Sequence, residues 1–171
     1  MRALSLFVPA ALALVLLAPP APALDFGGQL TLKSVVKLRK RKKPIKGQIS
    51  PPTSLLISTD ETQATFAAFI PSTYFPVQRK SARKFKVVRP AADDAAAFAE
   101  NVQGVLDFAG VPFRVESAKP SGSVKILKSG DVKSRIRVRG KGVAPKELVD
   151  TPEDVPAKLT LKFIYTGSPE S

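Results

Sequence analysis

The sequence contains no cysteine, no histidine and no tryptophan, and these absences exclude several classes of protein. Without cysteine the chain forms no disulfide framework and carries no lipid-modified N-terminal cysteine, so its fold must depend on packing. Without histidine it lacks the usual general base near neutral pH and the commonest nitrogen ligand for zinc or copper. We therefore predict no catalytic residue, no metal ligand and no cofactor, and expect that the protein is not an enzyme.

Two short segments carry residue types used in catalysis or metal binding, and both have simpler interpretations. Ser81 and Lys84 have the S-x-x-K spacing of a serine nucleophile motif, but they fall in an expected turn rather than at the start of a helix. Asp93 and Asp94 could offer oxygen ligands to calcium. Adjacent acids at the start of a helix more often stabilise the helix terminus.

The first 23 residues have the pattern of a signal peptide. Arg2 supplies a positive charge, residues 3–17 form an apolar run, and Ala21 and Ala23 give the small-x-small pattern of a cleavage site. The run is shorter than the roughly 20 residues that a spanning helix needs. We predict cleavage near Ala23, export to the periplasm or the extracellular space, and no transmembrane span after processing.

The charge of the chain is strongly one-sided, with 27 lysines and arginines against 14 acids and a formal net charge of +13. Such a bias favours attraction to polyanions or to an acidic surface. The alternative interpretation is that the charge serves only to keep the protein soluble.

Alternating apolar and polar residues dominate the rest of the sequence and predict strands. In residues 30–39 the even positions are mostly apolar, and three of the five odd positions are basic. Glycine and proline punctuate the segments at the spacing typical of antiparallel sheets. The expected strands cover residues 30–38, 45–49, 55–59, 62–70, 74–77, 84–89, 105–108, 113–117, 124–127, 132–139 and 158–165. We predict an all-β fold, an antiparallel β-sandwich or a barrel-like sandwich of short strands.

One segment has helical character. Residues 93–103 are rich in alanine, and Phe98, Ala99 and Val102 recur at the spacing of one helix face. Gly104 is expected to end this helix.

The domain organisation expected from these patterns is a signal peptide over residues 1–23 and a single all-β domain over 24–167. A faint internal repeat suggests an alternative in which two small β halves, about 29–90 and 104–167, stack on each other. Residues 168–171 are predicted to be a disordered tail.

The basic strands are the strongest candidate for a functional surface, because lysine and arginine alternate with apolar residues and so share one side of each strand. The candidate polyanion-binding residues are Lys33, Lys37, Arg39, Arg41, Lys84, Lys86, Arg135, Arg137, Arg139 and Lys141. An alternative interpretation is that these charges protect strand edges from aggregation and serve no partner.

The function predicted from the sequence is an exported, non-catalytic binding or structural β module. Its expected partner is an anionic polymer or an anionic membrane surface, held through the basic strands. The alternative is an envelope or extracellular assembly subunit that binds a protein partner through an exposed sheet edge.

Overall fold

The computed structural model describes residues 24–38, 44–68, 72–146 and 153–170. The predicted signal peptide therefore lies outside the described residues. The elements, in chain order, are β1 (Leu24–Leu38), β2 (Ile45–Ile49), β3 (Pro52–Ile57), β4 (Gln63–Phe66), β5 (Thr73–Ser81), β6 (Lys84–Val87), α1 (Ala95–Phe108), β7 (Arg114–Ile126), β8 (Val132–Ala144) and β9 (Val155–Pro169). In the described residues no helix is long and apolar enough to cross a membrane.

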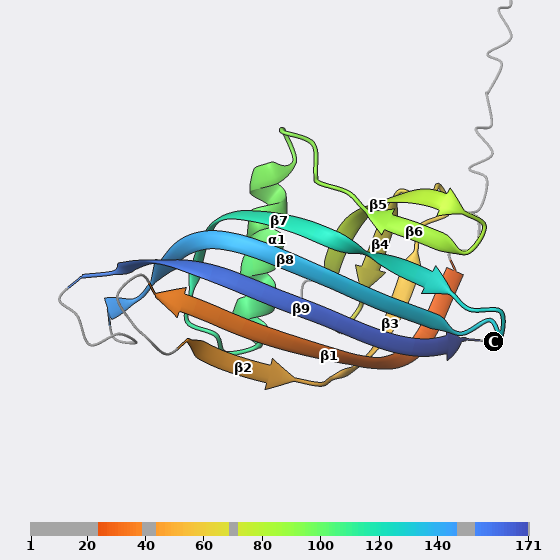
Figure 1. Cartoon of the computed structure of the whole chain (residues 1–171), viewed down its shortest axis with the longest axis horizontal. Helices are drawn as coiled ribbons and strands as arrows, with labels where there is room; N and C mark the ends of the chain where they lie inside the picture. The colour runs from red at the N-terminus through yellow and green to blue at the C-terminus, as the bar shows by residue number, and fades with distance from the viewer. Residues whose placement is uncertain (1–23, 39–43, 69–71, 147–152, 171) are drawn as a thin grey trace, which may run out of the picture.

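The strands form one antiparallel sheet in the order β2-β1-β3-β4-β5-β6-β7-β8-β9, and β9 also pairs with β1. That pairing closes eight strands into a barrel, with β2 as an additional strand beside β1. The long strands β1, β7, β8 and β9 lie side by side, whereas the short strands β3 to β6 gather at one end (Figure 1). The predicted all-β antiparallel fold is confirmed, and it takes the form of a barrel.

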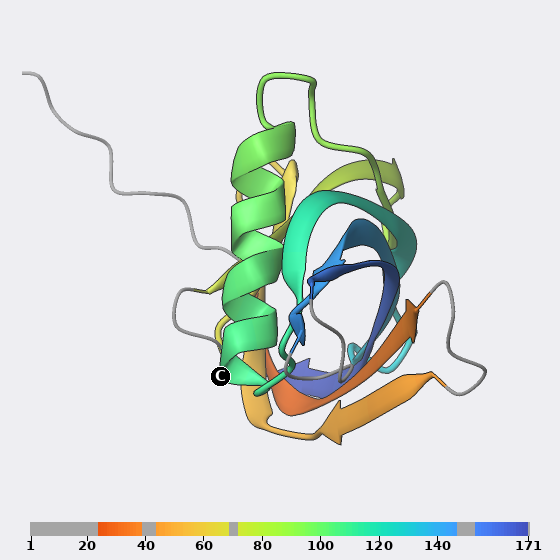
Figure 2. The same cartoon turned by 90° about the vertical axis from the view of Figure 1, so that its left-hand side faces the viewer.

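The ring of strands is complete only at the end that holds β3 to β6. β3 pairs with residues 24–29 of β1, and β6 pairs with residues 122–125 of β7. Beyond these points β1 has β2 as its neighbour, whereas among the described residues the first half of β7 pairs with β8 alone. α1 packs against β7, the turn after α1 meets β2, and Figure 2 shows the helix running along this side of the barrel.

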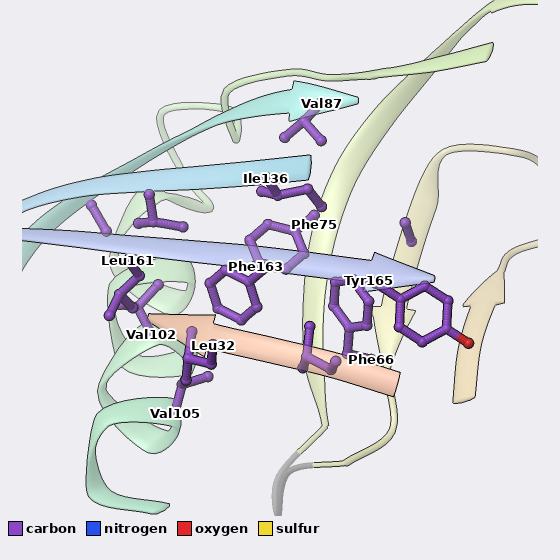
Figure 3. Packing of buried hydrophobic residues seen from close by; sticks show 14 of the residues in the cluster. Leu32, Phe66, Phe75, Val87, Val102, Val105, Ile136, Leu161, Phe163 and Tyr165 are labelled. Atoms are coloured by element: carbon purple, nitrogen blue, oxygen red, sulfur yellow. The ribbon is translucent and has the colours of Figure 1, made fainter. Parts of the chain in front are cut away.

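Aromatic side chains fill the centre of the barrel (Figure 3). The Phe163 ring lies 5.0 Å from the Phe75 ring and 6.0 Å from the Phe66 ring, measured between centroids. Tyr165 contacts Phe66 edge-on at 5.5 Å, and all four residues are fully buried. Each belongs to the inward set of its strand, so the alternation seen in the sequence places them together.

Tyr165 carries the polar group of this core. Its hydroxyl donates a hydrogen bond to the backbone carbonyl of Phe26. Burial raises the pKa of Tyr165 to about 12, because the phenolate would lose its hydration inside the barrel. The neutral phenol is thus the form that the fold holds.

The helix is longer than expected. α1 continues past Gly104 to Phe108, so the prediction of a strand over residues 105–108 was wrong. The physical reason is that the helical spacing persists beyond the glycine, and tertiary burial outweighs its low helix propensity. Asp94 occupies the N-cap position but makes no side-chain capping bond. The buried residues of α1 are Phe98, Ala99, Asn101, Val102, Val105 and Leu106.

β7 joins two predicted strands into one. The sequence predicted separate strands over 113–117 and 124–127 because Pro120 and Gly122 suggested a turn, and this was wrong. Pro120 lies in the half of β7 that has a strand on one side only, where a missing N–H is tolerated. The predicted tail also begins too early, since Ser168 and Pro169 continue β9 and pair with β1.

A side chain of α1 binds two backbone groups at the start of β7. The Gln103 amide nitrogen donates to the Phe113 carbonyl at 3.0 Å, and its oxygen accepts the Val115 N–H at 2.8 Å. Gln103 thereby occupies the position of a pairing strand at this edge.

We expect the substitution Gln103→Leu to lower the free energy of unfolding by about 2 kcal/mol, because two partly buried backbone groups lose their partners. Urea denaturation measures the change. The matched control is Glu100→Leu, an exposed position on the same helix, where a change within about 0.5 kcal/mol is expected. Equal effects of the two substitutions would contradict the role assigned to Gln103.

Candidate polyanion-binding face

The outward side chains of four neighbouring strands form the candidate site. In β1, β7, β8 and β9 the inward residues are buried, and the outward positions include eleven exposed lysines and arginines, five of them on β8. We call this surface the basic face, and it is the side of the barrel turned toward the viewer in Figure 1. Its members are Lys33, Lys37, Lys119, Lys125, Lys133, Arg135, Arg137, Arg139, Lys141, Lys158 and Lys162.

The strand register places these cations directly opposite one another. Lys162 of β9 lies between Lys33 of β1 and Arg137 of β8. Four residues along β9, Lys158 lies in the same way between Lys37 and Lys141. Like charges at directly paired positions destabilise a sheet by a few tenths of a kcal/mol each. A bound anion would offset this repulsion.

The three basic rows predicted from the sequence lie on one continuous surface. β9 bridges the β1 row to the β8 row, as described above. The β6 row joins through β7, because Lys84 pairs with Lys125 and Lys125 pairs with Lys133. Lys86 likewise pairs with Ser123, which lies opposite Arg135 on β8. Two other predicted residues, Arg39 and Arg41, lie outside the described residues.

Five residues of the basic face were not among those predicted from the sequence: Lys119, Lys125, Lys133, Lys158 and Lys162. The signal for the β9 pair was present, because Leu159, Leu161 and Phe163 alternate with Lys158, Thr160 and Lys162. For β7 the signal was hidden by the glycine and proline of the expected turn. Only the pairing of the intact strand with β8 places its lysines beside the arginines.

Carboxylates lie mainly away from the basic face. Ion pairs join Arg79 to Glu61 at 2.7 Å and Arg114 to Asp154 at 3.0 Å, and neither pair includes a member of the face. The helix side carries exposed acids instead, among them Glu100 and Asp107, and α1 lies behind the long strands in Figure 1. The exposed acids of α1 thus lie on a different side of the barrel from the basic face.

Carboxylates border the face at its two ends. Asp131, in the turn between β7 and β8, accepts hydrogen bonds from Ser168 and Ser129, and these bonds lower the pKa of its carboxyl. Glu116 is exposed at a bulge of β7, near the other end. The stretch between them combines the cations with neutral side chains such as Thr160 and Ser121.

Shallow hollows follow the outer side of β8 and β9. One is lined by Arg135, Arg137, Lys162 and Ile164, together with Ser121, Gly122, Ile136 and Phe163. Another is lined by Lys37, Ser117, Lys119, Arg139, Gly140, Lys141, Lys158, Leu159 and Thr160. Both offer hydrogen-bond donors on long flexible side chains, which suits capture of anionic oxygens.

The structure does not assemble a catalytic or calcium site from the described segments that carry such residue types. Ser81 ends β5 and pairs with Lys84 across a tight hairpin, away from the start of any helix. No group of three acidic or other metal-ligating side chains comes together in the part of the chain that the structure describes.

Comparison with known proteins does not identify a function for this chain. No protein-family model matches the sequence, and no curated protein matches it. Among solved structures, the ywiB protein from Bacillus subtilis is 9% identical, with a TM-score of 0.28, over 84% of this chain and 93% of its own. A likeness at that level carries no conclusion about activity.

Proposed function

We propose that the protein is an exported, non-catalytic binding module that captures an anionic polymer on the basic face. The single observation that carries this proposal is the register of β1, β9 and β8, in which rows of cations lie directly opposite one another without an interposed carboxylate. Cations that only protected strand edges would lie on unpaired strands. Here β8 and β9, which hold most of the face, are paired on both sides.

The proposed mechanism is electrostatic capture. Lysines and arginines of the face neutralise the anionic groups of the polymer. The polymer then releases its condensed counterions, and this release supplies the driving force. The exposed side chains reach toward solvent on flexible stems, so the contact is expected to be tolerant of sequence or sugar type. Export rests on the signal-peptide pattern of the first 23 residues.

The test is retention on immobilised heparin. Changing Arg135, Arg137 and Arg139 together to glutamine removes three neighbouring charges of β8, and elution is expected at a markedly lower salt concentration. The matched control changes Lys80, Arg83 and Arg89, three exposed cations outside the basic face, in the same way. Loss of retention in both variants to the same degree would show that only net charge matters, which would contradict the proposal.

A second function has one specific observation in its favour. β2 ends the order of the sheet and, within the described part of the chain, pairs with β1 alone, so its other edge is available to a strand of a partner protein. Size-exclusion chromatography across a salt series separates the two functions. Assembly through a strand edge should survive high salt, whereas complexes with an anionic polymer should dissociate.

A further inference from the structure

One part of the basic face is a defined hollow rather than a uniform charged surface. It is the hollow around Thr160 of β9, and we call it the Thr160 hollow. Lys37, Lys158 and Lys141 form one cross-strand row beside it. Lys119 and Arg139 lie in the next row, opposite Thr160 itself.

The shape follows from side-chain length. Thr160 is short, and the five lysines and arginines that surround it on β1, β7, β8 and β9 are long. Ser117 of β7 is also short, and it lines the hollow opposite Lys141 of β8. Long cationic chains therefore surround a floor that carries two hydroxyl groups, which can also donate hydrogen bonds.

The chemistry of the lining specifies the chemistry of the ligand. Among the described residues, the charged side chains that line the hollow are all cations, and lysine binds phosphate as a point charge without demanding a fixed geometry. No aromatic ring of the described residues lines the hollow, so neither a base nor a sugar ring would find a stacking partner there. A ligand that suits this lining is compact, accepts hydrogen bonds on every side and carries several negative charges close together.

We propose that the Thr160 hollow is a binding site for closely spaced phosphoryl groups, as in a soluble polyphosphate chain. This inference rests on the proposed function and narrows its ligand from anionic polymers in general to phosphate chains. A membrane surface fits less well, because the one large apolar residue exposed on the face, Ile164, is only 37% exposed and lines a different hollow.

One carboxylate lies close enough to modulate the site. Glu116 lines an adjoining hollow together with Lys37, Lys141 and Lys158, which the two hollows share. Its negative charge opposes an incoming anion. Removing that charge should therefore tighten binding of phosphate without touching any cation.

The experiment measures binding of sodium tripolyphosphate to the purified protein by isothermal titration calorimetry at low salt. The hollow variant changes Lys119, Arg139 and Lys158 to glutamine, and its affinity is expected to fall about tenfold. The control variant changes Lys84, Lys125 and Lys133, which also face one another across strands and carry the same charge. Its affinity is expected to stay within about threefold of the unchanged protein.

Glu116→Gln provides a second test that does not depend on a triple substitution. It is expected to raise the affinity for tripolyphosphate about two- to threefold. An unchanged or weaker affinity would count against the site.

The outcomes separate this inference from the proposed function. If the protein binds heparin but not tripolyphosphate, or if the two triple variants lose tripolyphosphate equally, the Thr160 hollow is not a phosphate site, while capture by the basic face stands. If the hollow variant loses binding to phosphatidylglycerol vesicles and keeps its affinity for tripolyphosphate, the surface serves a membrane and the inference is overturned. Failure to bind any of these anions would remove the proposed function as well.

Discussion

Raising the salt concentration from about 50 to about 200 mM is expected to weaken binding of a long phosphate polymer by about 10³- to 10⁵-fold, if about six to ten cations of the basic face contact phosphates. The reason is that each contact releases a condensed counterion, and added salt opposes that release. The face holds enough exposed cations for such a number of contacts. The measurement is the slope of log Kd against log salt concentration, by fluorescence anisotropy with labelled polyphosphate.

The triple substitution of Arg135, Arg137 and Arg139 by glutamine should make this slope shallower by about 2 to 3, because it removes three contacts. The substitution of Lys80, Arg83 and Arg89 should leave the slope unchanged. An affinity that varies less than about threefold over the whole salt range would contradict electrostatic capture.

The substitution Phe163→Ala is expected to lower the free energy of unfolding by about 3 to 5 kcal/mol. Its ring is fully buried and contacts the rings of Phe75 and Phe66. Truncation therefore leaves a cavity between side chains of β4, β5 and β9. That loss is a large share of the roughly 5 to 15 kcal/mol that stabilises a domain of this size. Chemical denaturation followed by circular dichroism measures it.

The neighbouring residue is the matched control for this prediction. Ile164 follows Phe163 on β9 but points outward, opposite Arg135. Ile164→Ala is expected to cost less than about 1 kcal/mol, because its side chain is already partly in water. Similar costs for the two substitutions would contradict the assignment of inward and outward sides on β9.

The strand pattern made most of the fold predictable, because a period of two in the sequence is a direct record of burial on one side. Residues 30–38 and 132–139 were expected to be strands with a basic side, and they lie within β1 and β8. Closure of the barrel was not predictable in the same way. It depends on the pairing of β1 with β9, whose residues are separated by most of the chain.

The misjudged segments share one cause, which is that local signals were outweighed by tertiary contacts. Gly104 normally favours the end of a helix, yet Val105 and Leu106 gain complete burial by continuing α1. Pro120 normally interrupts a strand, yet it lies where β7 has no strand on its second side. Neither the burial of α1 beyond Gly104 nor the one-sided pairing of β7 at Pro120 can be inferred from residues nearby in the sequence.

The sequence predicted the basic rows of the candidate site but not their arrangement. The rows on β1, β6 and β8 followed from alternation alone, but the sequence could not place them relative to one another. β9 makes the difference, because Lys158 and Lys162 turn two separate rows into continuous cross-strand ladders. The density of charge that supports polyanion capture is thus a property of the pairing and not of any single strand.

The most direct test of the basic face maps the bound polymer on the protein by nuclear magnetic resonance. Backbone amide shifts are followed while polyphosphate of defined length is added to the purified protein at low salt. If the polymer binds the basic face, the largest shifts fall in residues 33–37 of β1, 135–141 of β8 and 158–162 of β9, and α1 is unaffected. Shifts concentrated on α1 and β2, with those three segments unchanged, would contradict it.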